Sequence, residues 1–64
     1  MKVKYDKETD ILYIRLSDLV IAESDEDKKG VILDYTADGK LVGIEILEAS
    51  KTSAQPSKVE YESV

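Results

Sequence analysis

Acidic side chains dominate the chemistry open to this chain of 64 residues, which has 14 Asp and Glu but neither histidine nor cysteine. Without histidine there is no imidazole base or ligand, and without cysteine there is no disulfide or thiolate metal site. Ser17, Ser24, Ser50 and Ser53 therefore lack the base that activates a serine nucleophile. We predict no catalytic residue, no cofactor and no metal site, and expect a protein that is not an enzyme.

Two carboxylates, Asp34 and Glu45, interrupt apolar runs, and burial would raise their pKa values. The hairpin register expected below directs them to opposite faces of a sheet. That arrangement argues against an acid–base pair of the glycosidase type. We expect each carboxylate to lie at a sheet margin or to pair with a basic residue such as Arg15.

The acidic run Glu23, Asp25, Glu26 and Asp27 does not match the ligand spacing of a calcium-binding loop. A solvated loop explains it, and partner binding is the functional alternative. The net charge of −5 and the scattered lysines disfavour direct nucleic-acid binding. An acidic protein suits a basic protein partner, although solubility alone also accounts for such a charge.

No leader-like apolar core or run of about 20 apolar residues is present, so the expected location is the cytoplasm, with no membrane partner.

The first half of the chain alternates as strands do. Lys2–Asp6 and Ile11–Leu16 predict a hairpin whose turn is organised by Asp6 and Asp10, because an Asp at the head of a turn accepts a downstream backbone N–H. Tyr5, Tyr13 and Tyr35 are expected to be core rings with the hydroxyl at the rim. Leu19–Ala22 is expected to be a third strand and Glu23–Gly30 an exposed loop. A helix over residues 18–29 is the alternative.

The second half predicts a hairpin of Val31–Tyr35 and Leu41–Leu47 around Asp38 and Gly39, a type I turn followed by a left-handed glycine. The expected register sets Tyr35 opposite Leu41, Leu33 opposite Gly43 and Ile32 opposite Ile44. The missing side chain at Gly43 leaves room for a neighbouring ring.

In that register both faces of the hairpin are apolar. One face carries Val31, Leu33, Tyr35, Leu41 and Leu47, and the predicted dimer face carries Ile32, Val42, Ile44 and Ile46. A sheet that is apolar on both sides must be covered on both sides. We therefore expect a homodimer; a short helix opening at Glu48–Lys51 and folding over one face is the alternative.

The fold class expected from these patterns is mainly β: a small antiparallel meander of four to five strands. A short C-terminal helical turn is compatible with these patterns. Residues 1–51 form the single domain. Residues 52–64 form a polar, flexible tail, in which Lys58–Val64 has the alternation of a strand that could add to a sheet edge.

Several stretches together resemble one small prokaryotic family, the domain of unknown function 2283. They are Tyr5-Asp6 with Asp10, Leu12–Leu16, Glu23-Ser24, Gly30–Tyr35, Asp38–Leu47 and Ala49-Ser50. The resemblance covers about residues 1–51, and its most specific parts are Gly-Val-Ile-Leu-Asp-Tyr and Leu-Val-Gly-Ile-Glu-Ile. Thr36 departs from it, since an acidic residue is common there.

The resemblance transfers no catalytic residues. It implies an antitoxin role, as partner of a small basic RelE-like ribonuclease toxin, with the acidic run occupying the basic groove as a phosphate mimic. Two alternatives stay open: a homo-oligomeric ligand-binding or enzymatic protein with an interface site, and a dimeric DNA-binding autorepressor.

Overall fold

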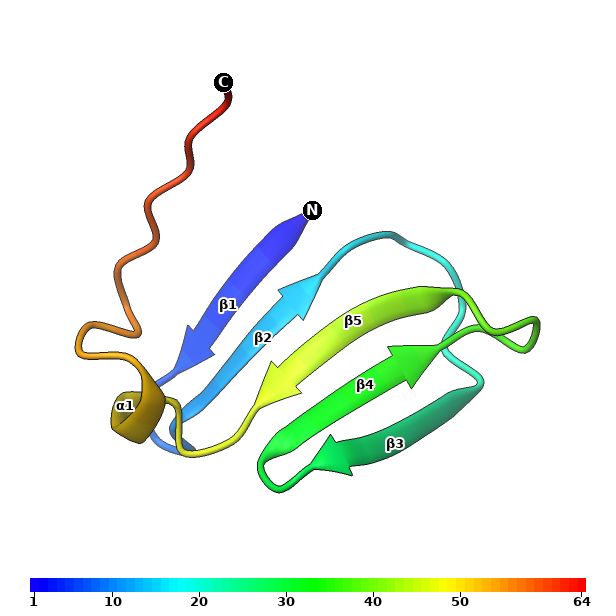
Figure 1. Cartoon of the computed structure of the whole chain (residues 1–64), viewed down its shortest axis with the longest axis horizontal. Helices are drawn as coiled ribbons and strands as arrows, with labels where there is room; N and C mark the ends of the chain where they lie inside the picture. Colours follow the sequence, from blue (N-terminus) through cyan, green and yellow to red (C-terminus); the bar gives the residue numbers. More distant parts are fainter.

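The computed structural model describes residues 1–64 and contains five strands in one antiparallel sheet (Figure 1). The strands are β1 (Lys2–Asp6), β2 (Ile11–Arg15), β3 (Glu23–Lys28), β4 (Val31–Tyr35) and β5 (Leu41–Ile46). A single helical turn, α1 (Ala49–Thr52), follows them. The prediction of a mainly β, antiparallel fold with a short C-terminal helical turn is confirmed.

The strand order is β1-β2-β5-β4-β3, so β2 pairs with β5 and not with the next strand in the chain. This order departs from a simple meander. The segment after β2 passes the ends of β5 and β4: the Leu16 N–H donates to the Val42 carbonyl at 2.7 Å, and the Ala22 N–H donates to the Tyr35 carbonyl at 2.8 Å.

The prediction for the third strand is wrong. Residues 19–22 form no strand, and the acidic segment expected to be a loop, or part of a helix over residues 18–29, is β3. Every residue of β3 is exposed, because β3 is an edge strand that pairs with β4 alone. Backbone pairing with β4 holds such a strand without an apolar side, so hydrophobic alternation is missing from its sequence.

The β4–β5 turn forms as predicted. Gly39 has a φ of +88°, its N–H donates to the Thr36 carbonyl at 3.0 Å, and the Thr36 N–H donates to the Lys40 carbonyl at 2.8 Å. The Thr36 hydroxyl also bonds to the Asp38 carboxylate. Tyr35 lies opposite Leu41, as expected.

Beyond this turn the expected register is wrong. A shift next to Tyr35 sets Asp34 opposite Gly43, Leu33 opposite Ile44 and Ile32 opposite Glu45. An extra residue in one strand of an antiparallel pair is a β-bulge, and it exchanges the facing of every residue beyond it relative to the partner strand.

The shift gives the sheet one apolar face and one mainly polar face. Two cross-strand rows make up the apolar face: Val3, Ile14, Ile44, Leu33 and Asp25 in one, and Tyr5, Leu12, Ile46, Val31 and Lys28 in the other. The expectation of two apolar faces is therefore wrong. Of the four residues assigned to a dimer face, Ile44 and Ile46 lie on the apolar face, Ile32 lies on the polar face, and Val42 is fully buried.

The sheet is a single layer. In Figure 1, α1 lies beyond the ends of β1 and β2 and crosses neither face. Val42 and Ala49 are the only buried apolar side chains, whereas the central apolar residues Ile14, Leu33 and Ile44 are half-buried. The alternative in which a helix at Glu48–Lys51 covers one face is thus wrong.

Asp10 ties α1 to the β1–β2 turn. Asp10 has a φ of 55°, its carbonyl accepts the Ala49 N–H at 2.9 Å, and its carboxylate accepts the Ser50 N–H at 3.0 Å and the Ser50 hydroxyl at 2.6 Å. The Tyr5 hydroxyl donates to the same carboxylate at 2.6 Å. Asp6 accepts the Glu8 N–H at 3.0 Å, which confirms the expected turn chemistry.

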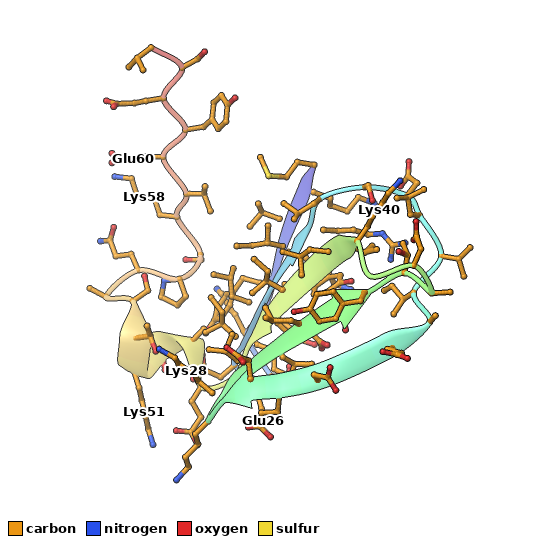
Figure 2. All side chains as sticks on the ribbon, turned by 45° about the vertical axis from the view of Figure 1, so that its right-hand side comes forward. Glu26, Lys28, Lys40, Lys51, Lys58 and Glu60 are labelled. Atoms are coloured by element: carbon orange, nitrogen blue, oxygen red, sulfur yellow. The ribbon has the colours of Figure 1, made fainter.

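The tail beyond α1 forms no helix or strand and leaves the sheet, as the labelled Lys58 and Glu60 show in Figure 2. None of the helical segments has the length and apolar character needed to cross a bilayer.

The Asp10 contacts predict a pH-dependent effect of Ser50→Ala. Bonds from Ser50 and Tyr5 lower the pKa of Asp10 below its ordinary value of 3.8. A lowered folded-state pKa stabilises the fold above the unfolded-state pKa, and this contribution is lost as the pH falls. Ser50→Ala should lower the Tm at neutral pH, and the deficit should shrink as the pH falls below the ordinary pKa of Asp10, 3.8. Ser57→Ala, in the exposed tail, is the control; equal Tm values for both variants at neutral pH would contradict the prediction.

Candidate functional site

The polar face of the sheet carries the most concentrated polar chemistry of the chain. Its two cross-strand rows are Lys2, Arg15, Gly43, Asp34 and Ser24, and Lys4, Tyr13, Glu45, Ile32 and Glu26. Each row crosses all five strands, so side chains that are far apart in sequence become neighbours here. A cluster of Tyr13, Ser24, Asp34 and Glu45 gathers around Gly43.

Gly43 makes this cluster possible. A Cβ at residue 43 would lie 2.7 Å from the Tyr13 hydroxyl oxygen and 3.1 Å from the ring carbon that bears it. The tyrosine ring of β2 therefore crosses β5 through the space that a side chain would fill, as the sequence predicted for a neighbouring ring. On the far side, the Tyr13 hydroxyl donates to Asp34 Oδ2 of β4 at 3.2 Å.

Asp34 is only 3% exposed and accepts two hydroxyl bonds. Ser24 Oγ of β3 donates to Oδ1 at 2.6 Å, while Tyr13 occupies Oδ2. No lysine or arginine forms an ion pair with it; the Arg15 guanidinium donates instead to the carbonyls of Ser17, at 2.9 Å, and Leu19, at 3.1 Å. The expectation that Asp34 lies at a margin or pairs with Arg15 is therefore wrong.

Glu45 lies on the same face as Asp34, contrary to the opposite facing expected from the sequence. Partial burial, and then the nearby Asp34 carboxylate, raise the pKa of Glu45. Burial and the Asp34 charge likewise raise the pKa of the Tyr13 hydroxyl. The wrong register prediction is the reason that the sequence separated the two carboxylates.

Beside the cluster lies an open hollow of about 320 Å³ lined by Lys4, Asp6, Thr9, Ile11, Tyr13 and Glu45. Tyr13 and Glu45 are the residues it shares with the cluster, and Lys4 and Asp6 come from the edge strand β1. The hollow faces water, so a polar ligand there would remain largely hydrated.

The cluster has the chemistry of a structural network. Both oxygens of Asp34 are engaged by hydroxyl donors, which is the arrangement that lets a carboxylate remain buried. No group of three or more acidic side chains converges as metal ligands would. Sequence reasoning missed the roles of Ser24 and of the Tyr13–Asp34 bond; an apolar strand interrupted by Asp and paired with a strand containing Gly was the available signal.

The four acidic residues predicted to bind a partner all lie on β3. Glu23 and Asp25 face the apolar side, opposite Tyr35 and Leu33, and Glu26 faces the polar side, opposite Ile32. Asp27 lies where the β3 register shifts, and all four side chains are exposed. Glu26, labelled in Figure 2, also accepts the Gly30 N–H at 2.9 Å and so holds the β3–β4 turn.

Residues 2–50 match a protein family described as a protein of unknown function (DUF2283). The chain belongs to this family. The segment that matches DUF2283 contains all five strands, the cluster around Gly43 and the Asp10–Ser50 contact, and it excludes the tail. No curated protein and no solved structure matches the chain.

The Gly43 cluster predicts that Gly43→Ala is destabilising, although the backbone there needs no positive φ. The added Cβ would overlap the Tyr13 ring and break its bond to Asp34. Overpacking of this kind costs about 1–3 kcal/mol in the free energy of unfolding, measurable by urea denaturation. The double variant Gly43→Ala with Tyr13→Leu should lose less free energy of unfolding than the two single variants lose in sum, because the smaller side chain at residue 13 makes room for the Cβ. Full additivity of the two substitutions would show that ring and Cβ do not collide.

Glu45→Gln is expected to stabilise the protein at neutral pH. A folded-state pKa raised above the unfolded-state value gives stability below the unfolded-state pKa that is lost as the pH rises. The ionised carboxylate is thus unfavourable at neutral pH, and glutamine removes it. The Tm of the variant should exceed that of the wild type at neutral pH and equal it at about pH 3. Glu62→Gln, in the exposed tail, is the control; an unchanged Tm for Glu45→Gln at neutral pH would refute this account.

Proposed function

We propose that this protein is a protein-interaction module that binds a small basic protein, as the antitoxin partner of a RelE-like ribonuclease toxin. The observation that carries the proposal is the acidic edge strand β3. It concentrates Glu23, Asp25, Glu26 and Asp27 on six exposed residues at one side of the sheet.

An edge strand offers a partner two kinds of contact. β3 pairs with β4 on one side only, so its outer backbone N–H and C=O groups remain free for an added strand. Its carboxylates point to both sides of that edge. A basic strand laid along β3 would therefore gain main-chain hydrogen bonds and ion pairs, while an acidic strand would be repelled.

The same charges suit a ribonuclease as the partner. Residues on one side of a strand repeat every ~6.6 Å, so β3 presents a row of carboxylates to lysine and arginine side chains that otherwise contact RNA phosphates. An inhibitor that binds those lysine and arginine side chains competes with the RNA substrate. The proposal needs no catalytic group in this chain.

Binding to the product of the adjacent gene tests the proposal. Glu23→Gln with Asp25→Asn removes two edge charges and spares Glu26, whose bond to Gly30 holds the turn. The Kd for the purified partner should rise about tenfold or more, and raised salt should narrow the difference between the variant and the wild type. Calorimetry at two salt concentrations measures both.

Glu60→Gln with Glu62→Gln removes the same charge from the exposed tail and is the matched control. A partner that is not toxic, or an edge variant that binds as tightly as the wild type, would refute the proposal.

A further inference from the structure

The apolar face of the sheet lacks a cover of its own. Central side chains of both apolar rows, such as Ile14, Ile44 and Leu12, are half-buried, and Val3 at the margin is 39% exposed. Two fully buried apolar residues, Val42 and Ala49, make too small a core for a chain of this length. A sheet with an apolar face is stable when that face packs against a second layer.

We infer that the second layer is another copy of this chain, so that the protein is a face-to-face dimer of two five-stranded sheets. The segments that could cover the face within one copy lie elsewhere: α1 packs at the end of the β1–β2 hairpin, and the polar tail leaves the sheet (Figures 1 and 2). The inference does not depend on the proposed function.

The area of the face fits such a dimer. Five strands ~4.8 Å apart, each of about five residues rising ~3.3 Å, give a footprint on the order of 400 Å² per copy. Because side chains stand up from the sheet, the two copies together would remove on the order of 1,000 Å² of accessible surface, which is about the size at which a specific interface begins.

The distribution of side chains on the face has the anatomy of an interface. The three inner strands β2, β5 and β4 contribute Leu12, Ile14, Val31, Leu33, Ile44 and Ile46, all apolar. Charged residues, Asp25 and Lys28, enter only at the β3 margin. An apolar centre with a polar rim is the usual arrangement of a protein interface.

Charge also selects one of two symmetric arrangements. In both arrangements the two-fold axis lies in the plane between the two sheets. An axis that runs across the strands would place β3 over the partner's β3 and bring Glu23 and Asp25 of both copies together. An axis parallel to the strands places β5, the central strand, over the partner's β5, and places β1 over the partner's β3. The second arrangement avoids the repulsion between like charges.

That arrangement makes a residue-level prediction. Val3, Ile14, Ile44, Leu33 and Asp25 form one row across the sheet, with Ile44 at its middle. Rotation about an axis parallel to the strands returns the row onto itself in reverse order. Ile44 then faces the partner's copy of the same residue, and Val3 faces the partner's copy of Asp25.

Light scattering after size exclusion and thermal unfolding at several protein concentrations test the dimer first. The expected mass is twice that of the chain, and the Tm should rise with concentration, because association stabilises the folded state by mass action. A monomeric mass with a Tm independent of concentration would overturn the inference, and the face would then belong to another protein.

Because the chain has no cysteine, single-cysteine variants locate the interface in folded protein. Ile44→Cys should cross-link in high yield with a short bismaleimide. Ile32→Cys, which is also half-buried but lies on the opposite face, should not.

A mixture of Val3→Cys and Asp25→Cys should cross-link, whereas Asp25→Cys alone should not. Cross-linking through Ile32→Cys in place of Ile44→Cys would overturn the assigned face, and cross-linking of Asp25→Cys alone would overturn the assigned axis.

Discussion

The register shift between β4 and β5 next to Tyr35 is the constraint on which the rest of the structure depends. It turns Asp34 and Glu45 to one face and Leu33 and Ile44 to the other. Without it, Leu33 would face Gly43, and the hairpin would be apolar on both sides. The shift therefore separates a polar face, with the Tyr13–Asp34 network, from an apolar face whose rows extend across the neighbouring strands.

The polar face shows how a small sheet accommodates a buried carboxylate without a neighbouring cation. Asp34 lies in β4, and its hydroxyl donors come from β3 on one side and from β2, two strands away, on the other. The second donor reaches Asp34 only because Gly43 leaves its place on β5 empty. One missing Cβ thus lets three strands share a polar network. Burial, and then the nearby Asp34 carboxylate, raise the pKa of the neighbouring Glu45.

Local patterns predicted the parts of the fold that local physics determines. The β1–β2 hairpin with its Asp6 turn and the glycine turn at Asp38 and Gly39 follow from residues close in sequence. The space for a ring over Gly43 also follows from the glycine alone, but its occupant, Tyr13, does not, because it comes from the non-local pairing of β2 with β5. The bulge did not follow, because its signal is the pairing itself. β3 did not follow either: an edge strand fully exposed to water has no hydrophobic alternation to reveal it.

The two surfaces of the sheet that lack a partner are different in kind, and this difference lets them coexist. Stacking through the apolar face leaves both edges of each sheet free, so the acidic β3 edge stays open to a basic strand while the dimer forms. An edge covered with carboxylates is also a poor template for its own kind, since two β3 strands repel each other. The charges that suit β3 to a basic partner thus also oppose the pairing of two β3 edges, whereas at the apolar face burial of hydrophobic surface supplies the stability that one layer lacks.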